Sequence, residues 1–172
     1  MEFRDLIFTR QSHRSYDKNK PVAREVLKRI CEAGIAAPSA ANRQPWEVWV
    51  VSSPAKLEQM KDVYRRDWFH QAPHVLLVVG DRKACWTRDA DQYQSLETDA
   101  AIAMDHMILA AENEGVSTCW IAAFDEAELR KVLGLETNQE VFAITPLGYP
   151  KGSDETRPKQ RKAFDDVVRW ID

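Results

Sequence analysis

The stretch TDAAIAMDHMILAAENE, residues 98–114, determines the fold. Its apolar residues cover more than half of the circumference of a helix, so this helix belongs in the centre of the protein. Its alanines allow a second helix to approach closely, and Gly115 is the residue expected just after a helix end. The apolar positions are Ala100, Ala101, Ala103, Met104, Met107, Ile108, Ala110 and Ala111.

Three further helices are predicted before this central one. Residues 2–9 form a short amphipathic pattern. A second helix opens at Pro21 and ends before Pro38, because a proline disfavours helical geometry in the residue that precedes it. Ser53, followed by a proline, is a typical N-cap, and the third helix runs from there to about Arg66.

Short strands separate the helices. The apolar run His74–Gly80 has the length of a strand and no polar face, so both of its faces are expected to be buried. Asp125 caps a helix that ends at Gly134, with Glu128 in the capping-box position. Strands and helices alternate without regular βαβ spacing, which favours the α+β class. The expected strands are residues 46–52, 74–80, 117–122 and 141–147.

The composition describes one domain. A chain of 172 residues, 44% of them hydrophobic, suits a single core, and a net charge of −3 gives no footprint for nucleic acid. No segment reaches the roughly 20 apolar residues that cross a bilayer. The N-terminus lacks the apolar core of a signal peptide, so a cytoplasmic location is expected. Three widely spaced cysteines, Cys31, Cys85 and Cys119, are expected to be reduced thiols, and no metal site is predicted.

Two basic segments could bind an anion. In RQSHR, residues 10–14, two guanidinium groups flank a hydroxyl, a combination that suits a phosphate. The alternative is favourable positive charge at a helix C-terminus. In KQR, residues 159–161, two basic side chains could reach one anion from an extended chain, although such a run is more often a solvated surface.

The loop APSAANRQPWEV, residues 37–48, is a third candidate. Ser39, Asn42 and Gln44 supply compact donors and acceptors between two prolines, and amides that both donate and accept suit the imide edge of a heterocycle. The alternative, equally supported by the spacing, is that these side chains satisfy the loop's own backbone.

The strand end STCWIAAFD, residues 117–125, is a fourth candidate. Strand ends in mixed folds are common ligand sites, and Ala122 and Ala123 are small enough for backbone amides to approach a flat ring. A core strand and a turn would produce the same pattern. The chain has no GxSxG, GxGxxG or Walker sequence, and no catalytic side chain is identified.

These four segments, in this order, resemble the nitroreductase family of FMN enzymes. RQSHRSY is similar to the family's RxSxR segment, and APSAANRQPWEV to its Pro-Ser-x-x-Asn-x-Gln-Pro-Trp loop. STCWIAAFD, the late strand ITPLGYPKG and KQR occupy the expected places, so the resemblance runs from about residue 3 to 170. It implies a central mixed sheet flanked by helices, in an intertwined homodimer with FMN sites at the interface.

The resemblance also implies roles for particular residues. Residues of the RxSxR and KQR segments would hold the FMN phosphate, and loop 37–48 would approach the flavin from the other subunit. Backbone at the strand end would lie beside the ring near N5, and Arg65 would lie at its pyrimidine edge. The implied cofactor-binding residues are Arg10, Gln11, Ser12, Arg14, Pro38, Ser39, Ala40, Asn42, Gln44, Arg65, Trp120, Ile121, Ala122, Ala123, Lys159 and Arg161.

The implied reaction is hydride transfer from NADH or NADPH, through flavin N5, to a nitroaromatic or quinone acceptor in a ping-pong cycle. The chain departs from longer relatives in two places. Residues 81–97 leave no room for the helices that cover the flavin there, and Ala122 stands where a Glu is common. A flavin-fragmenting or dehalogenating enzyme on the same fold, and a flavin-binding protein without turnover, are the alternatives.

Overall fold

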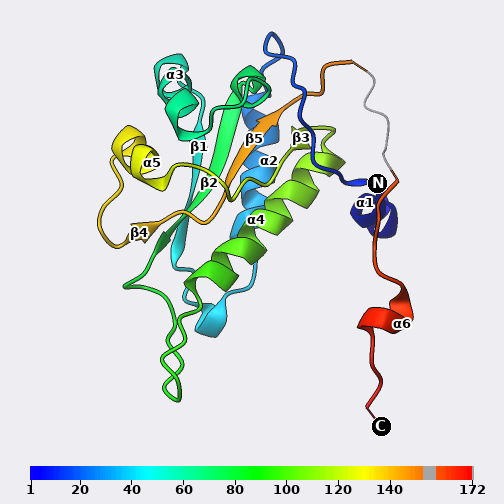
Figure 1. Ribbon diagram of the computed structural model, residues 1–172, viewed down its shortest axis with the longest axis vertical. Coiled ribbons are helices and arrows are strands. Elements are labelled where there is room, and N and C mark those ends of the chain that lie inside the picture. The colour runs from blue at the N-terminus through cyan, green and yellow to red at the C-terminus, as the bar shows by residue number, and fades with distance from the viewer. Residues whose placement is uncertain (153–157, 172) are drawn as a thin grey trace.

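The computed structural model describes residues 1–152 and 158–171, and α4, Leu96–Asn113, lies at its centre (Figure 1). One face of α4 packs on the sheet, and α2, Arg24–Ile35, packs beside it. The two helices approach closely at Gly34, where an added Cβ would lie 2.7 Å from Met107 Cγ. The central position predicted for this helix is therefore confirmed.

The sheet has the strand order β1-β2-β5-β3, and all four strands pair antiparallel with their neighbours. A short strand, β4, pairs with the end of β2. The parallel component is an isolated bridge between Ser12 and Thr118. The strands are β1 Trp46–Val51, β2 His74–Asp81, β3 Ser117–Thr118, β4 Gln139–Glu140 and β5 Ile144–Gly148.

Helices cover both faces of the sheet. Leu76 and Val78 point toward α2 and α4, whereas Val75, Leu77 and Val79 point toward α3, Pro54–Val63, and α5, Glu126–Leu133. Strand β2 is thus buried on both faces, as its unbroken apolar run predicts. The α+β class is confirmed.

Several predicted boundaries were wrong. Helix α2 begins at Arg24 rather than Pro21, because Val22 and its neighbours are extended and the Val22 N–H bonds to His74. Helix α3 ends at Val63, short of Arg66. The strand predicted over residues 141–147 begins only at Ile144, and β4 was missed. Two residues are too few to show a pattern of alternation.

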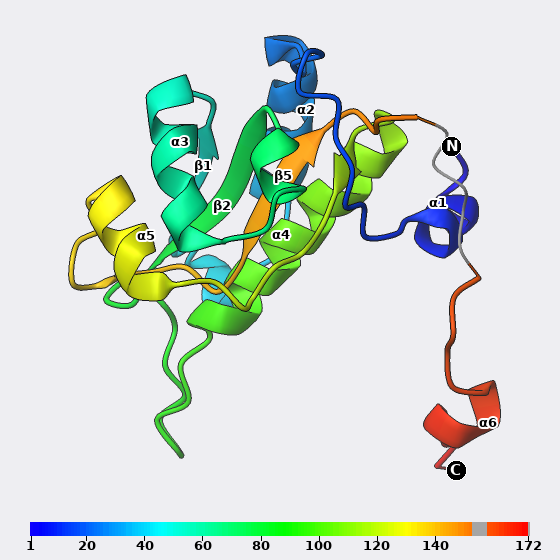
Figure 2. The same ribbon diagram turned by 45° about the horizontal axis from the view of Figure 1, so that its top comes forward.

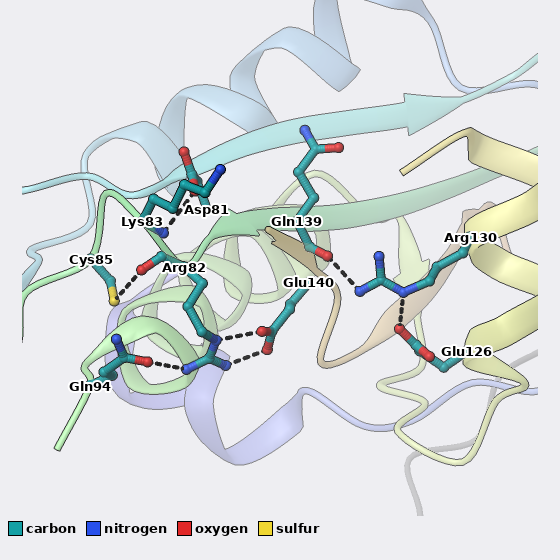
Figure 3. Close-up of polar contacts among 9 residues, drawn as sticks. All are labelled: Asp81, Arg82, Lys83, Cys85, Gln94, Glu126, Arg130, Gln139 and Glu140. Atoms are coloured by element: carbon teal, nitrogen blue, oxygen red, sulfur yellow. Dashed lines mark hydrogen bonds and ion pairs between the residues drawn. The ribbon is translucent and has the colours of Figure 1, made fainter. Parts of the chain in front are cut away.

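Residues 82–95 form a hairpin in which Thr87 bridges Gln94 (Figure 1). Its base is fixed by Arg82, which forms an ion pair with Glu140 and donates to Gln94 Oε1 at 2.7 Å (Figure 3). Cys85 donates from its thiol to the Arg82 carbonyl at 3.1 Å. The segment between β2 and α4 is therefore an anchored hairpin.

The two ends of the chain lie on the same side of the protein. Helix α1, Phe3–Thr9, sits near the C-terminal end of α4, where the N-terminal amine donates to Asn113 Oδ1 at 3.1 Å. Residues 158–171, with the short α6 at Phe164–Val167, extend away from the sheet and its helices (Figure 2). Phe164, Val167, Trp170 and Ile171 of this C-terminal arm are exposed. None of the helices described has the length and apolarity needed to cross a membrane.

Candidate functional site

A cluster of cations forms where the C-terminal arm passes α1. Lys159 Nζ donates to the carbonyl of Ile7 at 3.1 Å, which satisfies an acceptor at the end of α1. Burial lowers the pKa of Lys159, and the nearby charges of Arg10 and Arg161 lower it further. These three cations are thus neighbours, and their mutual repulsion is relieved when an anion binds among them.

The RQSHR segment is fixed against β3. The backbone N–H of His13 donates to the Thr118 carbonyl at 2.9 Å, beside the Ser12–Thr118 bridge. Ser12 and Arg14 are exposed on either side of the buried His13. The Cys119 thiol lies close by: burial raises its pKa, and Arg14, Ser12 and Arg10 oppose that rise. The fold therefore brings the RQSHR segment into contact with the start of the strand end, residues 117–125.

The strand end leaves the sheet at Ala122. Ile121 is buried and exchanges two backbone hydrogen bonds with Ile144, at 3.0 and 2.9 Å. Trp120, 37% exposed, and the two alanines Ala122 and Ala123 face outward. Four residues, 120–123, were assigned to this strand end. The N–H of one of them, Ile121, is already used in the sheet.

Arg65 lies beside the strand end. It follows α3 and, with Ala123 and Asp125, lines an open hollow of about 460 Å³. The backbone N–H of Asp125 donates to the Val63 carbonyl at 2.9 Å, so the chain after the strand end is tied to the end of α3. Arg14 lies nearby over the ring of Trp68, at 5.9 Å.

Loop 37–48 has a strained and internally bonded shape. Ala41, Asn42 and Gln44 have φ values of 49°, 52° and 48°, in the left-handed region that non-glycine residues rarely adopt. Ser39 Oγ accepts from the Gln44 N–H at 2.9 Å, and Gln44 Nε2 donates to Asn42 Oδ1 at 3.2 Å. Ser39 thus satisfies loop backbone, while the exposed amides of Asn42 and Gln44 retain further donors and acceptors. Such strain clusters at ligand sites.

Asp99, for which no role was predicted from the sequence, holds this loop through its buried carboxylate. Asp99 is 2% exposed and accepts from the backbone N–H of Ala40 at 2.9 Å and from Ser95 Oγ at 2.7 Å. An acidic residue in the first turn of a helix is ordinarily explained by the helix dipole. The signal that could have identified it is its position directly before the unbroken apolar run of residues 100–104.

One chain does not bring all four segments together. Loop 37–48 attaches to α4 at Asp99, whereas His13 of the RQSHR segment lies 3.7 Å from the Glu112 carboxylate near the other end of α4. At 1.5 Å per residue, these two points on one helix are about 20 Å apart. The RQSHR segment therefore lies toward one end of α4 and loop 37–48 toward the other, whereas Trp120 of the strand end lines a small hollow with Ala100 and Ala101, close to Asp99.

A hollowed apolar surface runs along α4 between these two points. One hollow of about 650 Å³ is lined by Phe3, Leu6, Leu109 and Ala110, among others. A second, of about 580 Å³, is lined by Tyr93 and Ile102. The two hollows share Asp105 and His106, so they form one continuous groove.

Comparisons with known proteins show the family of this chain. The family model described as "Nitroreductase family" matches residues 7–65 and 57–149. A protein from Archaeoglobus fulgidus, provisionally named an NADH dehydrogenase/NAD(P)H nitroreductase, is 30% identical over 151 residues, 85% of this chain and 84% of the relative. An iodotyrosine deiodinase from Thermotoga neapolitana is 23% identical, with 90% of each chain covered.

Among solved structures, a nitroreductase family protein from Clostridium difficile 630 superposes with a TM-score of 0.89 at 28% identity, covering 99% of this chain and 98% of that one. The family model alone spans far more than half of the sequence. The strained loop, the RQSHR segment on β3 and the strand end beside Arg65 all lie within the matched residues. The chain belongs to the nitroreductase family.

Proposed function

We propose that this protein binds FMN and transfers hydride from NADH or NADPH to an electron-poor acceptor, a nitroaromatic or a quinone. Membership of the nitroreductase family makes the chain an NAD(P)H-dependent oxidoreductase. The observation that supports FMN most directly is the cluster of Arg10, Lys159 and Arg161, since Arg10 also acts on Cys119, the residue before Trp120.

The phosphate of FMN fits this cluster by its chemistry. Arg10 and Arg161 supply directed pairs of donors, and Lys159 supplies a compact charge. Ser12 is exposed at the edge of the same region and adds a hydroxyl donor. Gln11 precedes it in the segment fixed to β3. The three positive charges are enough to balance the two negative charges of the phosphate.

The flavin ring fits the strand end. Ala122 and Ala123 place no bulky side chain between their backbone and a flat ring, and Trp120 borders them. Arg65 or Arg14 would lie toward the pyrimidine edge, where a guanidinium attracts negative charge. Bound FMN would supply the two-electron chemistry, while the protein binds, orients and shields it. No acid or base side chain is required of the protein.

We further propose a homodimer in which a second copy supplies loop 37–48 to each FMN site. The separation of about 20 Å along α4 prevents one chain from placing Pro38, Ser39, Ala40, Asn42 and Gln44 beside its own RQSHR segment. The apolar groove along α4 and the exposed apolar side chains of the C-terminal arm both offer contact surface to a second copy. An intertwined dimer would cover both and complete two sites.

A second candidate is reductive dehalogenation on the same fold, favoured by the similarity to an iodotyrosine deiodinase. The cation cluster would hold FMN in either reaction. It includes neither Ala122 nor the hairpin 82–95, so it does not distinguish one acceptor from the other. Anaerobic turnover with a nitroaromatic, a quinone and iodotyrosine, followed by product analysis, distinguishes the two reactions.

The proposal is tested with purified full-length protein. We expect it to bind FMN and become yellow, to bleach when NADH or NADPH is added anaerobically, and to regain its colour when a quinone is added. A protein that stays colourless with excess FMN would refute the proposal. Bound FMN that NADH and NADPH both fail to bleach would support a flavin-binding protein without turnover.

A further inference from the structure

The buried carboxylate of Asp99 connects two segments that lie far apart in the sequence. Oδ1 accepts from the backbone N–H of Ala40 in loop 37–48, at 2.9 Å, and Oδ2 accepts from the hydroxyl of Ser95, at 2.7 Å. Ser95 ends the hairpin 82–95 and stands directly before α4. One side chain thus holds the start of the loop and the end of the hairpin.

The loop needs such an anchor because of its backbone. Three non-glycine residues at positive φ persist only where surrounding contacts impose that geometry. The hydrogen bonds among Ser39, Asn42 and Gln44 are exposed to water and so contribute little. The far end of the loop is fixed by the Asp81 N–H, which donates to the Pro45 carbonyl at 2.7 Å. Asp99 provides the corresponding fixed point at the near end.

A carboxylate is well suited to this position. Hydrogen bonds to an ionised acceptor are stronger than those between neutral groups, and the first turn of α4 stabilises negative charge. At 2% exposure, water cannot replace the two donors. Loss of the carboxylate therefore releases Ala40 and lets the strained backbone relax.

We propose that Asp99 is a positioning residue of the flavin site: it holds loop 37–48 in the shape in which FMN bound by a second copy meets Ser39 and Asn42. This inference rests on the function proposed above. It also means that one carboxylate holds both the loop and the hairpin, since Ala40 donates to its Oδ1 and Ser95 to its Oδ2.

Four variants isolate this role. Asp99→Leu removes both acceptors at similar volume. Asp99→Asn keeps an oxygen for Ala40 and offers Ser95 an amide. Ala40→Pro removes only the N–H; Ser39, with φ −141° and ψ 157°, already has the geometry that precedes a proline, and Ala40 opens a 3₁₀ turn. Glu97→Gln is the matched control, because Glu97 is an exposed carboxylate in the same helical turn.

Two measurements report on the loop, and one of them does not need FMN. Trypsin cleavage after the exposed Arg43, followed by mass spectrometry of the full-length apoprotein, measures how tightly the loop is held. FMN titration by fluorescence, with the visible circular dichroism of the bound flavin, measures the site. We expect Asp99→Leu and Ala40→Pro to be cleaved about tenfold faster and to bind FMN about tenfold more weakly, with altered dichroism. Asp99→Asn and Glu97→Gln should stay close to wild type.

The outcomes separate this inference from the proposed function. Folded Asp99→Leu protein with wild-type cleavage and FMN affinity overturns the inference and leaves the function intact. If Asp99→Leu does not fold, Ala40→Pro decides, and its wild-type behaviour overturns the inference equally. Wild-type protein that binds no FMN refutes the proposed function and the flavin part of the inference, while cleavage at Arg43 still shows whether Asp99 holds the loop.

Discussion

Nε2 of His74 accepts a hydrogen bond from the backbone N–H of Val22, at 3.1 Å. Its other ring nitrogen, Nδ1, lies 2.7 Å from Ser52 Oγ, so the ring joins the start of β2 to the end of β1 and to the segment before α2. An Nε2 that accepts carries no proton, which makes this buried histidine neutral. A helix was wrongly predicted to begin at Pro21. The segment there is instead held by the Val22–His74 hydrogen bond, which depends on pH.

We expect stability to fall in acid through His74. Burial lowers the pKa of His74 below its ordinary 6.5. The unfolded chain then binds a proton on His74 more readily than the folded protein does. The contribution of His74 to the free energy of unfolding is therefore complete above about pH 6.5 and is lost as the pH falls toward the lowered pKa. Urea unfolding of wild type and His74→Gln between pH 5 and 8 tests this. An identical pH slope in the two proteins would exclude His74 as the cause.

The cation cluster predicts the response to charge removal. Arg10→Ala and Arg161→Ala should each weaken FMN binding by about tenfold or more, because a charge-assisted hydrogen bond contributes roughly 1.5–3 kcal/mol. Arg4→Ala removes the same charge from α1, where Arg4 lies over Phe8 at 5.9 Å, and should leave the affinity unchanged. Equilibrium dialysis with FMN measures all three. Equal affinities in all four proteins would refute the phosphate assignment.

The C-terminal arm predicts the oligomeric state. Deletion of the chain after Lys162 removes four exposed apolar side chains, Phe164, Val167, Trp170 and Ile171. We expect full-length protein to be a dimer and the shortened chain to dissociate at micromolar concentration, as judged by light scattering over a dilution series. A full-length monomer at high concentration would contradict the proposed intertwined dimer.

The contact between α2 and α4 predicts a packing penalty. An added Cβ at Gly34 would lie 2.7 Å from both Cγ and Sδ of Met107, so Gly34→Ala should destabilise the fold by about 1–3 kcal/mol. Met107→Ala leaves a cavity and should also destabilise it. The double variant should lose less stability than the sum of the losses in the two single variants, because the new methyl group occupies space that Met107 has vacated. Strict additivity in thermal unfolding would show that the two residues do not meet.

Local sequence determined much of this protein. The apolar periodicity of residues 98–114 specified the central helix, and the unbroken apolar run at 74–80 specified a strand buried on both faces. Asp125 caps α5 by accepting from the Glu128 N–H at 3.0 Å, and Gly134 ends it at φ 70°, as predicted. Caps and periodicity involve neighbouring residues, so they can be inferred without the fold.

Tertiary structure decided what depends on distant pairs. Ala40 and Asp99 are separated by 59 positions, and Val22 and His74 by 52, so neither bond has a local pattern that would reveal it. The same holds for the cluster of Arg10 with Lys159 and Arg161, whose segments lie at opposite ends of the chain. The sequence supplied the groups that could bind a flavin. Only the folded chain showed that α4 separates the loop from the cations, because that distance is set by the length of a helix and by where each segment packs against it.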